Sequence, residues 1–72
     1  MQDDITAIEQ EIAAFEKEQA ECVARIRALQ AEEDPVNGVF RHAEIHAAKQ
    51  DKLRLDTEIQ FCKNRINRRR LG

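Results

Sequence analysis

Apolar residues recur at alternating steps of three and four along the first half of the chain. The first stripe consists of Ile5, Ile8, Ile12, Phe15, Gln19, Cys22, Ile26 and Leu29. Seven of these eight residues are apolar, and a stripe that continues over about four heptads favours a coiled-coil helix over a strand. The pattern predicts an amphipathic helix over residues 3–33, with this stripe facing another helix.

The residues near the N-terminus are typical of a helix start. Thr6 followed by Glu9 matches a capping box. Asp3 and Asp4 also suit a helix N-terminus, both by capping and by charge. The first helix is therefore expected to begin within these first residues.

The first stripe contains one polar residue, Gln19. A polar seam residue can fix helix register or the number of partner helices, at some cost in stability. The alternative is a glutamine whose side chain extends to the edge of the bundle. Because of its place on the seam, Gln19 is also a candidate contact in a larger assembly.

The stretch EEDPVNGVF interrupts the helical pattern near the middle of the chain. Pro35 lacks the backbone N–H that a helix interior requires, and it disfavours helical angles at the residue before it. Gly38 can adopt a left-handed conformation. These two residues predict a break between two helices.

Two arrangements of the break are compatible with the residues. In the first, Asp34 caps a second helix that starts directly at Pro35. In the second, residues 34–39 form a turn and the second helix begins near Phe40. The Asn-Gly pair within the stretch favours the turn, so we expect the second helix over residues 40–70.

The second half of the chain is again typical of a helix, but its apolar surface is wider. Its stripe consists of Ile45, Ala48, Lys52, Leu55, Ile59, Cys62 and Ile66. Further apolar residues fall on other sides of the same helix: Phe40, Ala43, Ala47, Leu53 and Phe61. One partner helix cannot cover so wide a surface.

Two long helices joined by a short connection predict an all-α fold, an antiparallel coiled-coil hairpin. Each arm of ~30 residues has a length of ~45 Å. The wide apolar face then predicts association, most simply as two hairpins that form a four-helix bundle. The expected protein interface consists of Phe40, Ala47, Leu53 and Phe61, together with Gln19.

The charge of the chain is divided between its halves. Residues 1–34 hold ten acidic and three basic residues, a net charge of −7. Residues 35–72 hold four acidic and nine basic residues, a net charge of +5, so the whole chain carries −2. An antiparallel hairpin brings the acidic start beside the basic end, and both match the helix dipole. The simplest interpretation is therefore ion pairing between the two helices.

A nucleic-acid interface is the alternative explanation of the basic end. The stretch KNRINRRR provides five cations, Lys63, Arg65, Arg68, Arg69 and Arg70. They could neutralise several phosphates with salt-dependent affinity, while Asn64 and Asn67 could bond to bases or sugars. The acidic chain as a whole and the absence of an aromatic residue inside the cluster count against this alternative.

His42 and His46 are a weak candidate for a metal site. They stand four residues apart on one helix face, a spacing that can present two imidazoles to one ion. Glu44 is rotated away from both, so a third ligand would come from Glu33 or Gln30 or from another chain. Two ligands do not make a site, and we expect neither a metal nor a cofactor.

The two cysteines occupy seam positions, where a thiol behaves as a small apolar group. In a hairpin, Cys22 and Cys62 differ in height by ~15 Å, whereas a disulfide needs Cα atoms within ~7 Å. We expect free thiols, with a disulfide between two chains as the alternative. Free thiols favour a reducing cytoplasm, and neither a secretory leader nor a membrane span is expected.

No pattern in the chain is typical of catalysis. A Ser-His-Asp set, a glycine-rich phosphate loop and a paired-acid constellation are all lacking. We therefore expect a small non-enzymatic interaction protein, such as an adaptor, an inhibitor or a chaperone-like regulator. It would bind another protein and itself through helix–helix contacts. A nucleic-acid-binding hairpin dimer and a metal-binding protein are the alternatives.

Overall fold

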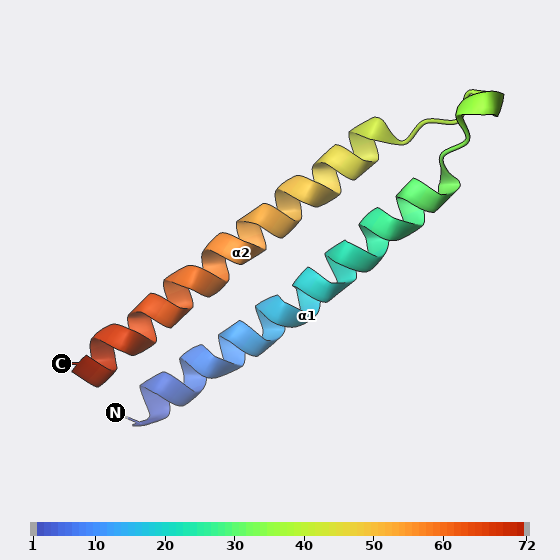
Figure 1. The fold of residues 1–72 in the computed structure, drawn as a ribbon. Helices are drawn as coiled ribbons and strands as arrows, with labels where there is room; N and C mark the ends of the chain where they lie inside the picture. Colours follow the sequence, from blue (N-terminus) through green and yellow to red (C-terminus); the bar gives the residue numbers. More distant parts are fainter. Residues whose placement is uncertain (1, 72) are drawn as a thin grey trace.

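A computed structural model describes residues 2–71, and side chains from Asp4 to Leu71. The chain forms helix α1 (Gln2–Glu32), a short 3-10 helix η1 (Pro35–Asn37) and helix α2 (His42–Leu71). The two long helices run antiparallel, so that both chain ends lie at one end of the molecule and the connection at the other (Figure 1). The predicted all-α hairpin is confirmed.

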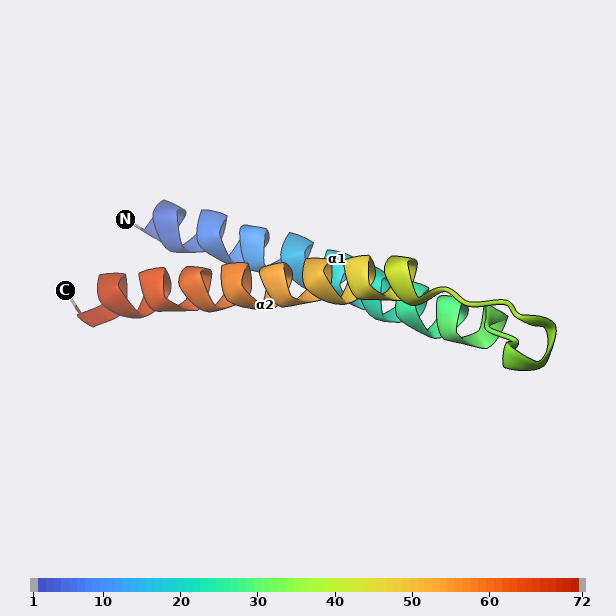
Figure 2. The same ribbon diagram turned by 90° about the horizontal axis from the view of Figure 1, so that it is seen from above.

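The hairpin is an elongated rod of 58 × 14 × 11 Å. Seen from above, α1 and α2 cross at a shallow angle and stay side by side over most of their length (Figure 2). A two-helix molecule of this width has no second layer of structure. Each helix therefore packs against one neighbour and exposes its other sides to solvent.

The seam between the helices is formed by the two predicted stripes. Every residue of the first stripe is at least partly buried, and six of the seven residues of the second are buried; the seventh, Lys52, is partly buried. The innermost side chain is Leu55, which is 1% exposed. Toward the chain ends, Ile8, Cys62 and Ile66 form a core cluster against which Ile5, Ile12 and Phe15 pack.

The connection combines features of both arrangements considered for the break. Asp34 caps η1, with Pro35 in its first turn, and accepts a hydrogen bond from the backbone N–H of Asn37 at 3.4 Å. Gly38 then ends this single turn in a left-handed conformation, at φ 73°. The helix that starts at Pro35 is thus three residues long and of the 3-10 type.

α2 begins at His42, two residues later than the sequence suggests. The reason is a β-bridge, in which the backbones of Asp34 and Val39 exchange two hydrogen bonds of 2.9 and 2.8 Å. The bridge engages the chain as far as Val39, and Phe40 and Arg41 then lead into α2. Arg41 caps α2, because its carbonyl accepts the N–H of Ile45 at 2.9 Å.

The capping box expected at Thr6 and Glu9 lies inside a helix. α1 already includes Gln2, so the backbone N–H groups near Thr6 bond within the helix and need no side-chain cap. Asp3 is also expected to cap this helix, but its side chain lies outside the part of the chain whose side chains are described. Asp4 is described, and it lies at the acidic end of α1.

Candidate functional site

The outward side of α2 carries two of the large apolar side chains that the hairpin leaves exposed. Leu53 is 59% exposed and Phe61 is 60% exposed, and both point away from the seam that buries Leu55. Phe61 follows Leu53 by eight residues, and ~100° of rotation per residue brings the two onto neighbouring lines of one helix face. We call this face the outer stripe of α2; it consists of Gln50, Leu53, Thr57, Gln60, Phe61 and Asn64.

The outer stripe carries no charged residue, although 36% of the chain is charged. All six of its residues are exposed. Its polar members are partly satisfied within α2, since Thr57 Oγ1 donates to the carbonyl of Leu53 at 3.1 Å and Gln60 Nε2 donates to Asn64 Oδ1 at 3.1 Å. Such a surface is less costly to desolvate than one whose polar groups bond only to water.

The structure does not gather all of the predicted interface residues. Phe40 is 53% exposed but precedes α2, where its ring stacks on that of His42 with centroids 5.3 Å apart. Ala47 is exposed one turn into α2 and rotated away from Leu53 by ~120°. Leu53 and Phe61 therefore form the candidate site, and the other two residues lie outside it.

Gln19 lies inside the hairpin rather than on an outer surface. Its side-chain amide donates a hydrogen bond across the seam to Asp56, which also accepts one from Lys52 Nζ at 3.2 Å. These bonds to Gln19 and Lys52 stabilise the ionised form and lower the pKa of Asp56 below the usual value for aspartate. The polar seam residue thus pairs with a residue of α2 across the seam, and its role in fixing the register stays a prediction.

Two of the five cations in the basic cluster contact acidic residues of α1. Arg65 Nη1 lies 3.3 Å from the carboxylate of Glu11, and Arg69 Nε lies 3.9 Å from that of Asp4. The expected ion pairing between the two helices is observed for these two residues. For Lys63, Arg68 and Arg70, no ion pair with a described side chain is found.

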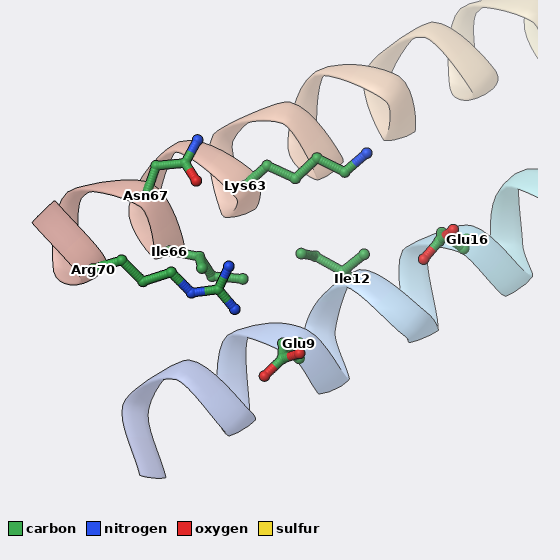
Figure 3. A pocket seen from close by; sticks show the side chains of 7 residues that line it. All are labelled: Glu9, Ile12, Glu16, Lys63, Ile66, Asn67 and Arg70. Atoms are coloured by element: carbon green, nitrogen blue, oxygen red, sulfur yellow. The ribbon is translucent and has the colours of Figure 1, made fainter. Parts of the chain in front are cut away.

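A hollow of about 430 Å³ lies between the helices near the basic cluster. Lys63, Asn67 and Arg70 line its α2 side, Glu9 and Glu16 line its α1 side, and Ile12 and Ile66 lie between them (Figure 3). Carboxylates facing the same hollow would repel a phosphate. The nucleic-acid interface stays a prediction, and this arrangement gives it no added support.

The histidine pair has a carboxylate neighbour at the hairpin tip. Glu33 Oε2 lies 3.7 Å from His42 Nδ1 and accepts the backbone N–H of Arg41 at 3.3 Å. Glu33 thus helps to cap α2, a role with no signal in the sequence. Among the residues that the structure describes, no three His, Cys, Asp or Glu side chains are grouped so that they could hold a metal ion.

Both cysteines are free thiols on the seam. Cys62 is 3% exposed, and its Sγ lies 3.8 Å from Glu11 Oε2. Burial, followed by the nearby carboxylate of Glu11, raises the pKa of Cys62. A thiol held in its neutral form is a poor nucleophile, and Cys62 packs in the core cluster with Ile8 and Ile66.

Comparison with known proteins assigns this chain to no group. No protein-family model matches it, and neither the curated proteins nor the solved structures yielded a match. Over the described residues, no helix is both long enough and apolar enough to cross a bilayer. The geometry of the hairpin is therefore the whole basis for a proposal about its function.

Proposed function

We propose that this chain is a small non-enzymatic interaction protein, a coiled-coil adaptor, inhibitor or chaperone-like regulator that binds another protein and itself through α2. One observation carries the proposal: Leu53 and Phe61, each about 60% exposed, lie on a charge-free stripe of a highly charged chain. An exposed apolar patch rimmed by polar residues is typical of a protein interaction site.

The physical mechanism is the docking of a further helix along α2. α1 already occupies the inner side of α2, and the outer stripe repeats the three-and-four spacing that an incoming helix requires. Aromatic and aliphatic anchors at the centre of such a contact contribute most of the binding free energy. Leu53 and Phe61 are the anchors.

A charge-insertion experiment tests the proposal. The Leu53→Glu/Phe61→Glu variant places two carboxylates on the outer stripe, where they would have to be desolvated on binding. The matched control, Ala13→Glu/Ala24→Glu, adds the same charge to exposed positions of α1. Each protein is immobilised, incubated with a lysate of the cells that produce it, crosslinked and analysed by mass spectrometry, and its oligomeric state is measured by light scattering.

We expect the outer-stripe variant to lose the bound protein, the self-association or both, while the control retains them. Circular dichroism verifies that both variants keep their helix content. If both variants bind as the unmodified chain does, the outer stripe is not an interaction site and the proposal is wrong.

A further inference from the structure

The outer stripe contains a hollow whose lining has the spacing of a coiled-coil hole. The hollow has a volume of about 350 Å³ and is lined by Asp56, Thr57, Gln60, Phe61 and Asn64. The last four of these residues stand at positions i, i+3, i+4 and i+7 of one helix. In coiled coils, four residues of one helix form the hole that receives a side chain from the facing helix.

The same stripe also presents a side chain that fits this kind of hole. Leu53 lies one turn before Thr57, is 59% exposed and is the bulkiest residue of that turn on the outer stripe. Leucine is a common knob in antiparallel and parallel coiled coils. The stripe therefore carries both a knob and a hole, separated by about two turns, ~12 Å along α2.

We propose that the outer stripe binds the outer stripe of a second copy of this chain, antiparallel, with the two-fold axis passing beside Thr57. This geometry follows from the spacing, because Leu53 and Phe61 are equally distant from Thr57. The axis then places Leu53 of each copy opposite Phe61 and the hole of the other. The inference rests on the proposed function and specifies the partner and register at the same site.

Self-complementarity favours a second copy over an unrelated protein. A two-fold contact uses one surface patch twice, so each knob must find its hole on an identical surface. The outer stripe offers both parts of such a contact, the exposed Leu53 and the hollow at Phe61. The polar groups at its centre are compatible with contact, since Thr57 and Gln60 already donate hydrogen bonds within α2.

The charges beside the outer stripe select the antiparallel orientation. With the axis at Thr57, Arg54 of one copy lies within about two residues of the level of Glu58 of the other, ~3 Å along the axis. A parallel pair would instead place Arg54 beside Arg54 and bring together both basic ends, which hold Arg68, Arg69 and Arg70. Like charges at the same level are destabilising.

The opposite flank limits the strength of the contact. There, Lys49 of one copy approaches the level of Lys63 of the other, and the two Asp56 carboxylates lie within about two residues of one level, ~3 Å along the axis, so both pairs of like charges repel. Added salt screens this repulsion and the attraction on the other flank alike. The apolar knobs therefore determine the affinity, and the charges determine the orientation.

Cysteine crosslinking tests both the partner and the register. In a Cys22→Ala/Cys62→Ala background, Thr57→Cys places two thiols at the two-fold axis, where helices ~9 Å apart bring the Cα atoms within disulfide reach. Gln50→Cys is the matched control, because the two Gln50 positions would lie ~21 Å apart along the axis. Circular dichroism of each variant before oxidation verifies that the hairpin is folded.

We expect mild oxidation to yield a covalent dimer for Thr57→Cys and none for Gln50→Cys. An equimolar mixture of Gln50→Cys and Asn64→Cys should yield the mixed dimer, because these positions lie at one level in the antiparallel register. Equal crosslinking of Thr57→Cys and Gln50→Cys indicates a parallel pair and overturns the proposal.

Two further outcomes separate this inference from the proposed function. The unmodified chain could be monomeric by light scattering and still capture another protein that the Leu53→Glu/Phe61→Glu variant does not capture. This result overturns the dimer and retains the interaction site. A dimer that crosslinks at neither position overturns the register. A monomer that captures nothing through Leu53 and Phe61 overturns both.

Discussion

The two sides of α2 differ sharply although both follow the same heptad spacing. Leu53 and Leu55 stand two residues apart, yet Leu53 is 59% exposed and Leu55 is 1% exposed. A separation of ~200° around the helix is the whole geometric difference. The comparison shows that helical spacing alone does not bury an apolar residue, since α1 covers the face that holds Leu55 and leaves Leu53 exposed.

The composition of the two faces differs as well. The seam residues of α2 are aliphatic or cysteine except for Lys52, whereas the outer stripe combines two large apolar residues with amides and a hydroxyl. Continuous apolar burial gives a stable fold. Isolated anchors among satisfied polar groups are compatible both with exposure to water and with reversible association.

The largest expected effect separates the two leucines directly. Leu55→Ala should destabilise the hairpin by about 2–5 kcal/mol because it opens a cavity in the seam, enough to unfold much of so small a domain. Leu53→Ala should change the stability of the single chain by no more than ~0.5 kcal/mol. Urea unfolding at low protein concentration, followed by circular dichroism, measures both. Equal losses would mean that the outer stripe is part of the folded core.

Thiol labelling measures how well the inner seam excludes solvent along its length. Cys22 is half-buried and lines an open hollow between the helices, whereas Cys62 is buried and its pKa is raised. We expect Cys62 to react with a thiol reagent at least about 10-fold more slowly than Cys22, because it must wait for local opening. Peptide mass spectrometry over a time course gives the two rates. Equal labelling rates for Cys22 and Cys62 in the folded protein would mean that solvent reaches both thiols equally well.

The polar contact in the seam should make part of the stability depend on pH. Because the pKa of Asp56 is lowered in the folded chain, its ionised form adds stability above the unfolded value of ~3.9, and this stability is lost as the pH falls through the lower folded pKa. Asp56→Asn should therefore lower the melting temperature at pH 7 and have a smaller effect as the pH approaches 2.

A double-mutant cycle with Gln19 provides the control for this pH dependence. If the hydrogen bond from Gln19 is the main cause, Asp56→Asn should have a smaller effect at pH 7 in a Gln19→Ala background. Thermal melts of the four proteins at two pH values give the coupling between the residues. If Asp56→Asn lowers the melting temperature equally with and without Gln19, the hydrogen bond from Gln19 does not cause the pH dependence.

Ion pairs at the edges of the seam should contribute less than the contacts inside it. Arg65→Gln removes the contact with Glu11 and should cost about 0–1 kcal/mol at low salt, because both side chains are roughly half exposed. The cost should vanish at high salt. Arg68→Gln is the control, since this residue has no ion pair with a described side chain. Urea unfolding at two salt concentrations distinguishes the variants, and a salt-independent loss would indicate packing by the arginine stem.

The smallest expected effect is binding of nucleic acid by the basic end. Because two of its five cations contact α1 carboxylates and acidic residues share its hollow, we expect no binding of RNA or DNA above background at physiological salt. Fluorescence anisotropy with labelled oligonucleotides at two salt concentrations checks this expectation. Tight binding that is lost in Lys63→Gln/Arg70→Gln would favour the nucleic-acid alternative.

Local detail was harder to predict than architecture. Both stripes and the break at Pro35 could be identified because each rests on the conformational preferences of individual residues and on helical period. The bridge between Asp34 and Val39, the cap from Glu33 to the backbone of Arg41 and the pairing of Gln19 with Asp56 could not. Each of these contacts joins residues whose proximity depends on how the chain folds back.

The sequence by itself determined that two amphipathic helices fold back on one another and that α2 has more apolar surface than α1 can cover. Heptad spacing and a helix-breaking proline are local properties, so both can be recognised in the sequence. The positions of Leu53 and Phe61 off the seam, and of Gln19 on it, also follow from helical spacing. Only the tertiary structure decided the individual contacts: it stacked Phe40 on His42 in the connection and paired Gln19 with Asp56 across the seam. The physical reason is that these contacts join residues whose distance and orientation depend on how the chain folds back.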